Sequence, residues 1–225
     1  MLMSMHASMP KRGVVIAIDG PAGAGKSTLA RSLASELGLP YVNTGLMYRA
    51  LAAQALAKGV GLDDGDSLAR LARRIGFSLG PGDAGSLLVE GNEPVGELSS
   101  ADVEAVVSRV ARHPAVRSVM RDEQRSLGSL GCVMEGRDIG TVVFPDADVK
   151  IFLSADPDER ARRRAFERGG THDAGAAVTR RDRLDAKTNP LFPAPDAHVL
   201  DSTALGAEEV RTRASALIRR ALRAP

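Results

Sequence analysis

Short segments rich in hydrophobic residues, typical of buried strands, alternate along the chain with segments of helical spacing. The strand-like segments lie at residues 14–18, 41–43, 131–134, 149–153 and 198–201. After the first, Leu29, Leu33 and Leu37 repeat every fourth residue, as on one buried face of a helix. After the last, a second helical stripe is formed by Val210, Ala214, Leu217, Ile218 and Leu222. Strands that alternate with helices predict an α/β fold.

The middle of the chain departs from this alternation. Residues 77–79 and 87–90 are two short strand-like segments, and the Gly, Pro and Asp residues between them favour a turn. We therefore expect a small β-hairpin here, and we interpret residues 76–100, approximately, as an insert in the α/β domain.

Helices are expected on both sides of this hairpin. Residues 68–75 form one candidate, and a stripe of four valines (Val103, Val106, Val107 and Val110) predicts another. Pro114, which is favoured in the first turn of a helix, begins the next. We expect residues 13–225 to form one domain and residues 1–12 to be a flexible extension.

Composition narrows the class of protein. The 225 residues include 30 basic and 28 acidic side chains, so the net charge of +2 is too small to indicate wholesale nucleic-acid binding. Aromatic residues make up only 3%, which leaves few platforms for stacking bases. Cys132, the single cysteine, lies in a hydrophobic run, so we expect a buried thiol and a reducing, cytoplasmic location. We also expect no membrane span, because no hydrophobic run approaches about 18 residues.

The most specific motif follows the first strand directly. Gly, four residues, Gly-Lys and a hydroxyl residue make up the phosphate-loop pattern, here Gly20, Pro21, Ala22, Gly23, Ala24, Gly25, Lys26, Ser27 and Thr28. Backbone N–H groups and the positive end of the following helix can hold a polyphosphate there. Lys26 can reach its β and γ phosphates, and the Ser27 hydroxyl can bind Mg²⁺.

A second group of charged residues follows the strand at 131–134. Glu135, Arg137 and Asp138 lie where ligands bind in open α/β sheets, outside the carboxyl ends of the strands. A plain polar turn is the alternative. Glu135 is a candidate to hold a water molecule of a Mg²⁺ shell, because acidic residues at the end of a core strand serve phosphate-loop enzymes in that way.

Other charged residues allow two interpretations each. Arg49 is expected to face water, as exposed arginines commonly do, although it could point into the cleft beside the loop. Ser108 and Arg117 could lie on solvated helix faces. The arginines at 160, 162, 163 and 164 form either a solvated face or a group that closes over a transferring phosphoryl group. The four histidines lack metal-ligand spacing.

Taken together, the motifs resemble those of bacterial cytidylate kinases, which are phosphate-loop nucleoside monophosphate kinases. The likeness runs from about Val14 to Ala221 and depends on the order of its motifs. These are Ile18-Asp19-Gly20-Pro21, Thr44-Gly45 with Met47-Tyr48-Arg49, the run from Glu135 to Ala147, Lys150-Ile151-Phe152-Leu153, and Arg181-Asp182 with Asp185.

The resemblance implies a three-layer sandwich: a five-stranded parallel sheet flanked by helices, with the β insert in the monophosphate-binding region and a mobile lid at about 157–179. The implied reaction is ATP-dependent phosphorylation of CMP or dCMP, with Mg²⁺ as cofactor, by a monomer without nucleic-acid or membrane partners. Residues 20–28 would hold ATP, with Lys26, Arg163 and Arg181 as catalytic residues. The implied substrate-binding residues are Thr44, Arg49, Ser108, Arg117, Arg137, Asp138, Arg181 and Asp185.

The chain departs from the family pattern in one place. The family usually carries an arginine shortly after the position of Asp185, where this chain has Lys187, so we expect weaker CMP binding. Two alternatives stay open: a phosphate-loop kinase of another small acceptor, and a non-catalytic nucleotide-binding regulator. The many arginines able to hold a second phosphate favour a kinase.

Overall fold

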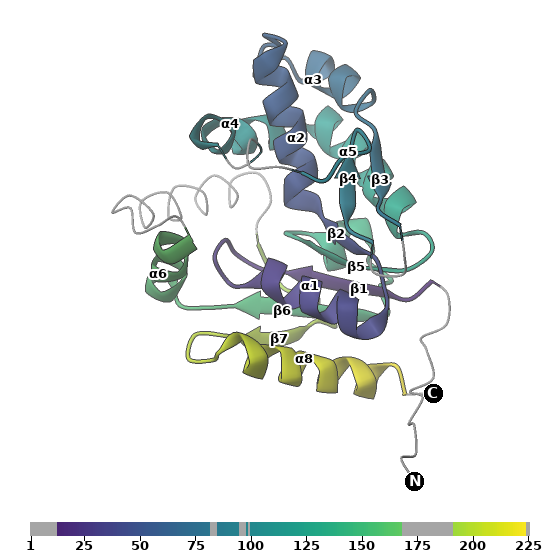
Figure 1. The fold of residues 1–225 in the computed structure, drawn as a ribbon, viewed down its shortest axis with the longest axis vertical. Helices are drawn as coiled ribbons and strands as arrows, with labels where there is room; N and C mark the ends of the chain where they lie inside the picture. Colours follow the sequence, from purple (N-terminus) through teal and green to yellow (C-terminus); the bar gives the residue numbers. More distant parts are fainter. Residues whose placement is uncertain (1–12, 82–84, 95–97, 99, 168–190, 224–225) are drawn as a thin grey trace.

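The computed structural model describes residues 13–81, 85–94, 98, 100–167 and 191–223. Its main sheet has five parallel strands in the order β2-β5-β1-β6-β7 (Figure 1). The strands are β1 (Val15–Asp19), β2 (Tyr41–Asn43), β5 (Cys132–Gly136), β6 (Val149–Ser154) and β7 (His198–Asp201). All five residues of the central strand β1 are buried, as expected for a parallel sheet covered on both faces. The predicted five-stranded parallel sheet is confirmed.

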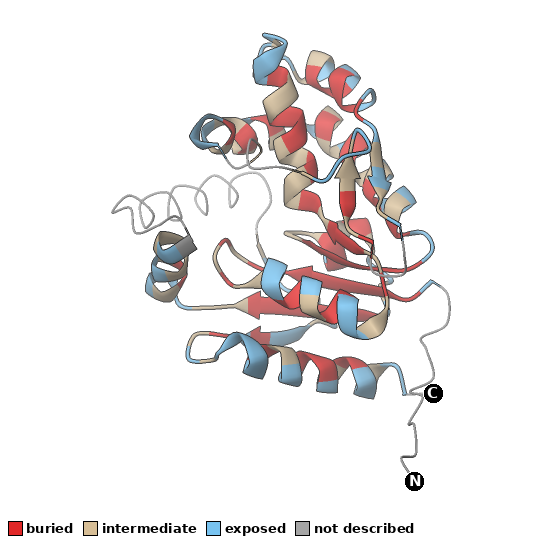
Figure 2. Cartoon of the chain, viewed as in Figure 1, coloured by how far each residue is buried: buried red, intermediate tan, exposed pale blue. Residues whose placement is uncertain are grey.

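Helices cover both faces of this sheet. One face is covered by α1 (Lys26–Leu37) and α8 (Ala207–Ala221). The other is covered by α2 (Thr44–Ala57) and α5 (Pro114–Gly128). On these two helices pack α3 (Gly65–Ala72) and α4 (Ala101–Ala111), which extend the same hydrophobic core away from the sheet. Because side chains alternate along a strand, β1 contributes Ile16 and Ile18 to the first core and Val15 and Ala17 to the second. The buried colour of the central strands in Figure 2 agrees with a sheet covered on both faces.

The expected hairpin is present as a separate two-stranded antiparallel sheet. It consists of β3 (Phe77–Leu79) and β4 (Leu87–Val89), with Ser78 opposite Leu88. A backbone hydrogen bond of 3.0 Å from the Tyr41 N–H to the Gly85 carbonyl connects the hairpin to the edge of the main sheet at β2. The hairpin therefore extends the side of the molecule on which β2 lies.

Two elements at the carboxyl edge of the sheet bear on the site. A short π-helix, η2 (Ile139–Val143), follows β5, and α6 (Pro157–Glu167) follows β6. The expected lid at 157–179 is thus described only as far as α6. Arg181, Asp185 and Lys187 lie outside the described residues.

Two smaller expectations have opposite outcomes. Cys132 is fully buried, as predicted, and burial raises the pKa of its thiol to about 12. Leu222 was expected on the core face of the last helix, but it is 38% exposed. The reason is that α8 ends at Ala221, so that Leu222 forms the C-cap. Among the described residues, we find no helix with the length and hydrophobicity needed to cross a membrane.

Candidate active site

The phosphate loop connects β1 to α1 at the carboxyl edge of the sheet. Gly23 adopts a positive φ of 76° and packs against α6 so closely that an added β-carbon would lie 2.7 Å from the Arg160 carbonyl oxygen. Only glycine fits such a position. The Lys26 Nζ donates to the Pro21 carbonyl oxygen at 2.8 Å, so the lysine folds back over its own loop. Because α1 begins at Lys26, the positive end of its dipole meets the loop.

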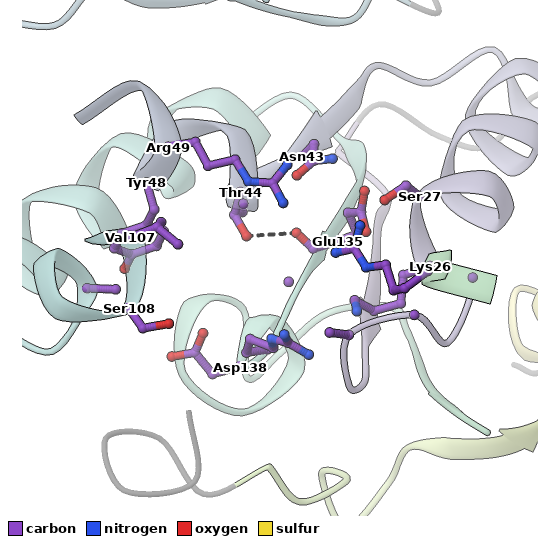
Figure 3. Close-up of a pocket in the computed structure, with 18 of the residues that line it drawn as sticks. Lys26, Ser27, Asn43, Thr44, Tyr48, Arg49, Val107, Ser108, Glu135 and Asp138 are labelled. Carbon is purple, nitrogen blue, oxygen red and sulfur yellow. Dashed lines mark hydrogen bonds between the residues drawn. The ribbon is translucent and has the colours of Figure 1, made fainter. Parts of the chain in front are cut away.

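A pocket adjoins this loop. One of its walls is formed by the loop itself, and the other by residues that come later in the chain. We name the first the loop wall, formed by Gly23, Gly25, Lys26, Ser27 and Thr28. We name the second the far wall, formed by Thr44, Arg49, Ser108, Arg117, Arg137 and Asp138. In Figure 3, Lys26 and Ser27 lie on one side of the view, Tyr48, Val107 and Ser108 on the other, and Thr44 and Glu135 between them.

Glu135 occupies the middle of the pocket at the end of β5 and is buried. The Tyr41 hydroxyl donates to its Oε1 at 2.5 Å, and the Thr44 hydroxyl donates to its backbone carbonyl at 2.8 Å (Figure 3). Burial, and next the Glu135 charge, raise the pKa of Tyr41, which keeps its hydroxyl protonated and able to donate. Glu135 is therefore held in one orientation from two neighbouring elements.

The far wall contains two ion pairs. The Arg117 Nη2 donates to Asp138 Oδ2 at 2.6 Å, which joins α5 to the turn after β5. Arg49 lies 3.3 Å from Glu104 on α4, and its side chain is only 14% exposed. The expectation from sequence that Arg49 faces water is therefore wrong. Its acidic partner, 55 positions along the chain, offsets the cost of burial.

Arg137 connects the two walls. Its Nη1 donates to the Gly20 carbonyl oxygen at 2.7 Å, which links the turn after β5 to the first residue of the phosphate loop. The pairing of β1 with β5 sets Asp19 opposite Gly136, so these two turns begin side by side. Groups at the ends of two adjacent parallel strands thus meet over one pocket.

Helix α6 places its arginines differently from the sequence expectation. Arg163 lies behind the loop: its Nη1 donates to the Ala24 carbonyl at 3.4 Å and to Ser202 Oγ at 3.0 Å, and its Nη2 donates to the Ser202 carbonyl at 2.6 Å. Arg160 likewise donates to the Ala22 carbonyl at 3.2 Å. Arg164, the next residue, lines the pocket. The direct catalytic role expected for Arg163 is not supported by this placement.

The structure therefore brings together all the expected substrate-binding residues that it describes. It also adds Asn43, Tyr48 and Val107, which the sequence interpretation did not select, and of the four candidate arginines of α6 it places Arg164 in the pocket. The sequence positions of the first three could have indicated them, because each directly precedes a predicted site residue: Asn43 precedes Thr44, Tyr48 precedes Arg49, and Val107 precedes Ser108. Tyr48 is largely buried in the pocket, and this burial raises its pKa to about 12.

The residues present suit a magnesium ion held mostly by phosphate. No group of three or more His, Cys, Asp or Glu side chains able to bind a metal occurs among the described residues. Mg²⁺ retains several waters and takes only one or two protein ligands when it accompanies a nucleotide. A loop hydroxyl at Ser27 and one buried carboxylate at Glu135, both lining the pocket, fit that requirement.

A five-stranded parallel sheet with a phosphate loop after its central strand, and a second charged wall facing that loop, defines a phosphate-loop kinase. Residues 16–220 match the family model described as cytidylate kinase. The chain belongs to the cytidylate kinase family.

Individual relatives agree with this assignment. A cytidylate kinase from Pelotomaculum thermopropionicum is 50% identical over 206 residues, covering 87% of this chain and 91% of the relative. A cytidylate kinase from Geobacillus kaustophilus is 47% identical, with 90% and 95% covered. Among solved structures, an uncharacterised protein from Eubacterium ventriosum aligns with a TM-score of 0.51 at 12% identity, covering 92% of this chain and 98% of that one. That likeness concerns the fold alone.

Proposed function

We propose that this chain transfers the γ-phosphoryl group of ATP to the phosphate of CMP or dCMP, giving ADP with CDP or dCDP. The observation that carries the proposal is the pocket in which the loop wall faces the far wall. A regulator that only bound one nucleotide would need the loop wall alone. The far wall supplies three arginines, enough to hold a second phosphorylated molecule.

Donor binding falls to the loop wall. Backbone N–H groups of residues 20–28 hold the ATP phosphates, and Lys26 neutralises charge on the β and γ phosphates. Arg164, which lines the pocket, takes the role expected of Arg163, while Arg181 stays a sequence-based proposal. Ser27 and, through water, Glu135 would hold Mg²⁺, which when bound would offset charge on the donor phosphates. No protein base is required, because the CMP phosphate is already ionised.

Acceptor binding falls to the far wall. Thr44, Arg49 and Arg137 hold the phosphate and ribose of CMP, with Asp185 as a further residue proposed from sequence. Ser108, Arg117 and Asp138 read the base. Cytosine presents an amine donor beside the N3 and O2 acceptors, so an Asp138 carboxylate accepts from the amine and Arg117 donates to the acceptors. Uracil turns its O4 acceptor toward the same carboxylate and is disfavoured.

The surroundings of the reaction are part of the proposal. We place the protein in the cytoplasm as a monomer, in pyrimidine nucleotide metabolism, without nucleic-acid or membrane partners. The buried free thiol of Cys132 and the nearly balanced charge support this assignment. Size-exclusion chromatography with light scattering tests the monomer.

The decisive experiment is ADP release from Mg²⁺-ATP with CMP, dCMP, UMP, AMP and GMP as acceptors. We expect kcat/KM for CMP to exceed that for UMP by about 10- to 200-fold, the value of one polar base contact. Lys26→Ala should abolish turnover, whereas Lys58→Ala, an exposed lysine at the end of α2, should retain it. Equal turnover across the acceptors would contradict the cytosine site, and turnover that survives Lys26→Ala would contradict the loop assignment.

A further inference from the structure

Asp19, the last residue of β1, carries a buried carboxylate that the proposed chemistry does not use. Its side chain contacts the turn after β5. Oδ1 accepts from the Ile139 N–H and Oδ2 from the Gly140 N–H, each at 2.8 Å. The residue is only 7% exposed. Burying a carboxylate costs free energy unless hydrogen bonds compensate for the lost hydration, so the partners of Asp19 are important for its role.

Those two N–H groups are the first of the π-helix η2. The opening N–H groups of a helix have no partner within it and are usually satisfied by the side chain of the N-cap residue. Here the N-cap is Asp138, a residue type that ordinarily takes this role, yet its side chain makes no cap hydrogen bond with η2, whose residues are all described. Asp138 instead extends into the pocket and pairs with Arg117.

We propose that Asp19 is a positioning residue for base selection: by accepting the two N–H groups that Asp138 would otherwise take, it keeps the Asp138 carboxylate in the pocket. The inference rests on the proposed function, in which Asp138 reads cytosine. Asp138 thus occupies the N-cap position of η2, while Asp19 accepts the N–H groups that an N-cap side chain usually accepts. Without Asp19, the local N–H groups compete with Arg117 and the base for Asp138.

The backbone around Asp138 leaves little room for another solution. An added β-carbon on Gly136 would lie 2.6 Å from the Ile139 side chain, and one on Gly140 would lie 3.1 Å from the Lys150 side chain. The turn is therefore packed from both sides. A change at Asp19 is then expressed mainly in where the Asp138 side chain points, and less in movement of the turn.

Asp19→Asn tests the proposal, because the amide keeps one acceptor but presents an NH₂ group to the second N–H donor. We expect the ratio of kcat/KM for CMP to that for UMP to fall by about tenfold, the order of one lost polar base contact, with a smaller change in KM for ATP. In an Asp138→Asn background, Asp19→Asn should cause no further loss of this ratio, since the two substitutions act through one carboxylate.

Asp148→Asn is the matched control. Asp148 also accepts a backbone N–H of β1, that of Val15 at 2.7 Å, but at the opposite end of the strand from the pocket. It should lower stability without changing the CMP to UMP ratio. Asp19→Ser, whose hydroxyl can accept one N–H, serves if Asp19→Asn does not fold, as judged by its melting transition.

Three results are informative. An unchanged CMP to UMP ratio in a folded Asp19 variant overturns the positioning role, as does an Asp19 effect of full size in the Asp138→Asn background. Equal use of CMP and UMP by the unsubstituted protein instead overturns the proposed function, and is thereby distinguished from failure of the Asp19 inference.

Discussion

Arg117 and Asp138 lie on different elements but share a short ion pair, with 2.6 Å between Nη2 and Oδ2. Both side chains are partly exposed to the pocket, at 26% and 19%. A base that contacts both side chains must provide a donor for the carboxylate and acceptors for the guanidinium. Cytosine offers that combination. Uracil instead has an acceptor, O4, where cytosine presents its amine donor to the carboxylate.

Asp138→Asn should therefore weaken selection of the base more than catalysis. We expect the CMP to UMP ratio of kcat/KM to fall by about 10- to 100-fold, because the amide can donate to uracil O4 as well as accept from the cytosine amine. Steady-state kinetics with both acceptors measure the ratio. Asp122→Asn, an exposed carboxylate on the same helix as Arg117, should leave it unchanged. An undiminished ratio in Asp138→Asn would remove Asp138 from base selection.

Arg163 and Arg164 should have separable effects although they are adjacent. Arg164→Ala is expected to lower kcat by about 10³-fold or more, as for arginines that stabilise a transferring phosphoryl group, with little change in melting temperature. Arg163→Ala removes bonds to Ala24 and Ser202 and should lower the free energy of unfolding by about 1–3 kcal/mol. Thermal melts and kinetics on both variants measure this division.

Arg162 provides the control within the same helix. Its side chain is 74% exposed and forms its ion pair with Glu159 on the surface. Surface pairs contribute little, so Arg162→Ala should resemble the unsubstituted protein in both measurements. A loss of kcat in Arg163→Ala as large as that in Arg164→Ala would restore the direct catalytic role that the sequence suggested for Arg163.

Glu135→Gln should change the dependence on magnesium. If Glu135 orients a water of the Mg²⁺ shell, its loss is expected to raise the Mg²⁺ concentration for half-maximal activity by about 10- to 100-fold, as for other outer-shell ligands. Calorimetric titration of ATP binding with and without Mg²⁺ gives a readout independent of turnover. Glu209→Gln, on the exposed side of α8, is the control. Identical Mg²⁺ curves for Glu135→Gln and the control would exclude this role.

Asp19 should give stability an unusual dependence on pH. Burial raises its pKa to about 6, despite the opposing hydrogen bonds from Gly140 and Ile139. Of the nearby charges, Asp138 raises the pKa further and Lys26 lowers it, while the Lys150 stem packs beside Gly140. Since the unfolded pKa is about 3.9, the folded protein binds this proton more tightly. Its stabilising contribution is complete below about pH 4 and is lost as pH rises through about 6.

Asp19→Asn isolates this contribution because an amide does not titrate. The melting temperature of the unsubstituted protein, minus that of Asp19→Asn, should decrease as pH rises from 4.5 to 7.5. Stability is the better readout than turnover, since the second pKa of a phosphate monoester is also about 6. A difference that stays constant, or grows, over this range would argue against a raised pKa at Asp19.

Local sequence patterns predicted the helices and strands better than they predicted which of these elements lie side by side. The phosphate loop and its flanking strand and helix follow from residues 14–37, and the hairpin from the turn residues between positions 79 and 87. The strand order β2-β5-β1-β6-β7 does not follow from such patterns, because periodicity says which residues are buried and not which strand lies alongside. The order was not predicted; the resemblance to a known family led us to expect only a five-stranded parallel sheet, together with the grouping of the substrate-binding residues.

The surroundings of Arg49 and Arg163 show what local patterns cannot predict. Arg49 is held by Glu104, and Arg163 by Ser202, and both partners are distant in sequence. Arginine is exposed in most proteins, but this average says nothing about whether a particular arginine has a partner from a distant part of the chain. Helical spacing also could not distinguish Arg163 from Arg164, because the direction each one takes depends on how α6 packs against the loop.

The two ion pairs of the far wall have a consequence for the lifetime of the product. Arg49 and Arg117 already have carboxylate partners, so a phosphate or base that binds there exchanges one partner for another. The gain in affinity is smaller than unpartnered arginines would provide, and the carboxylates regain their arginines when the product departs. With the far wall as the acceptor site proposed above, this internal competition is expected to weaken retention of the product and so to favour its release before the next cycle begins.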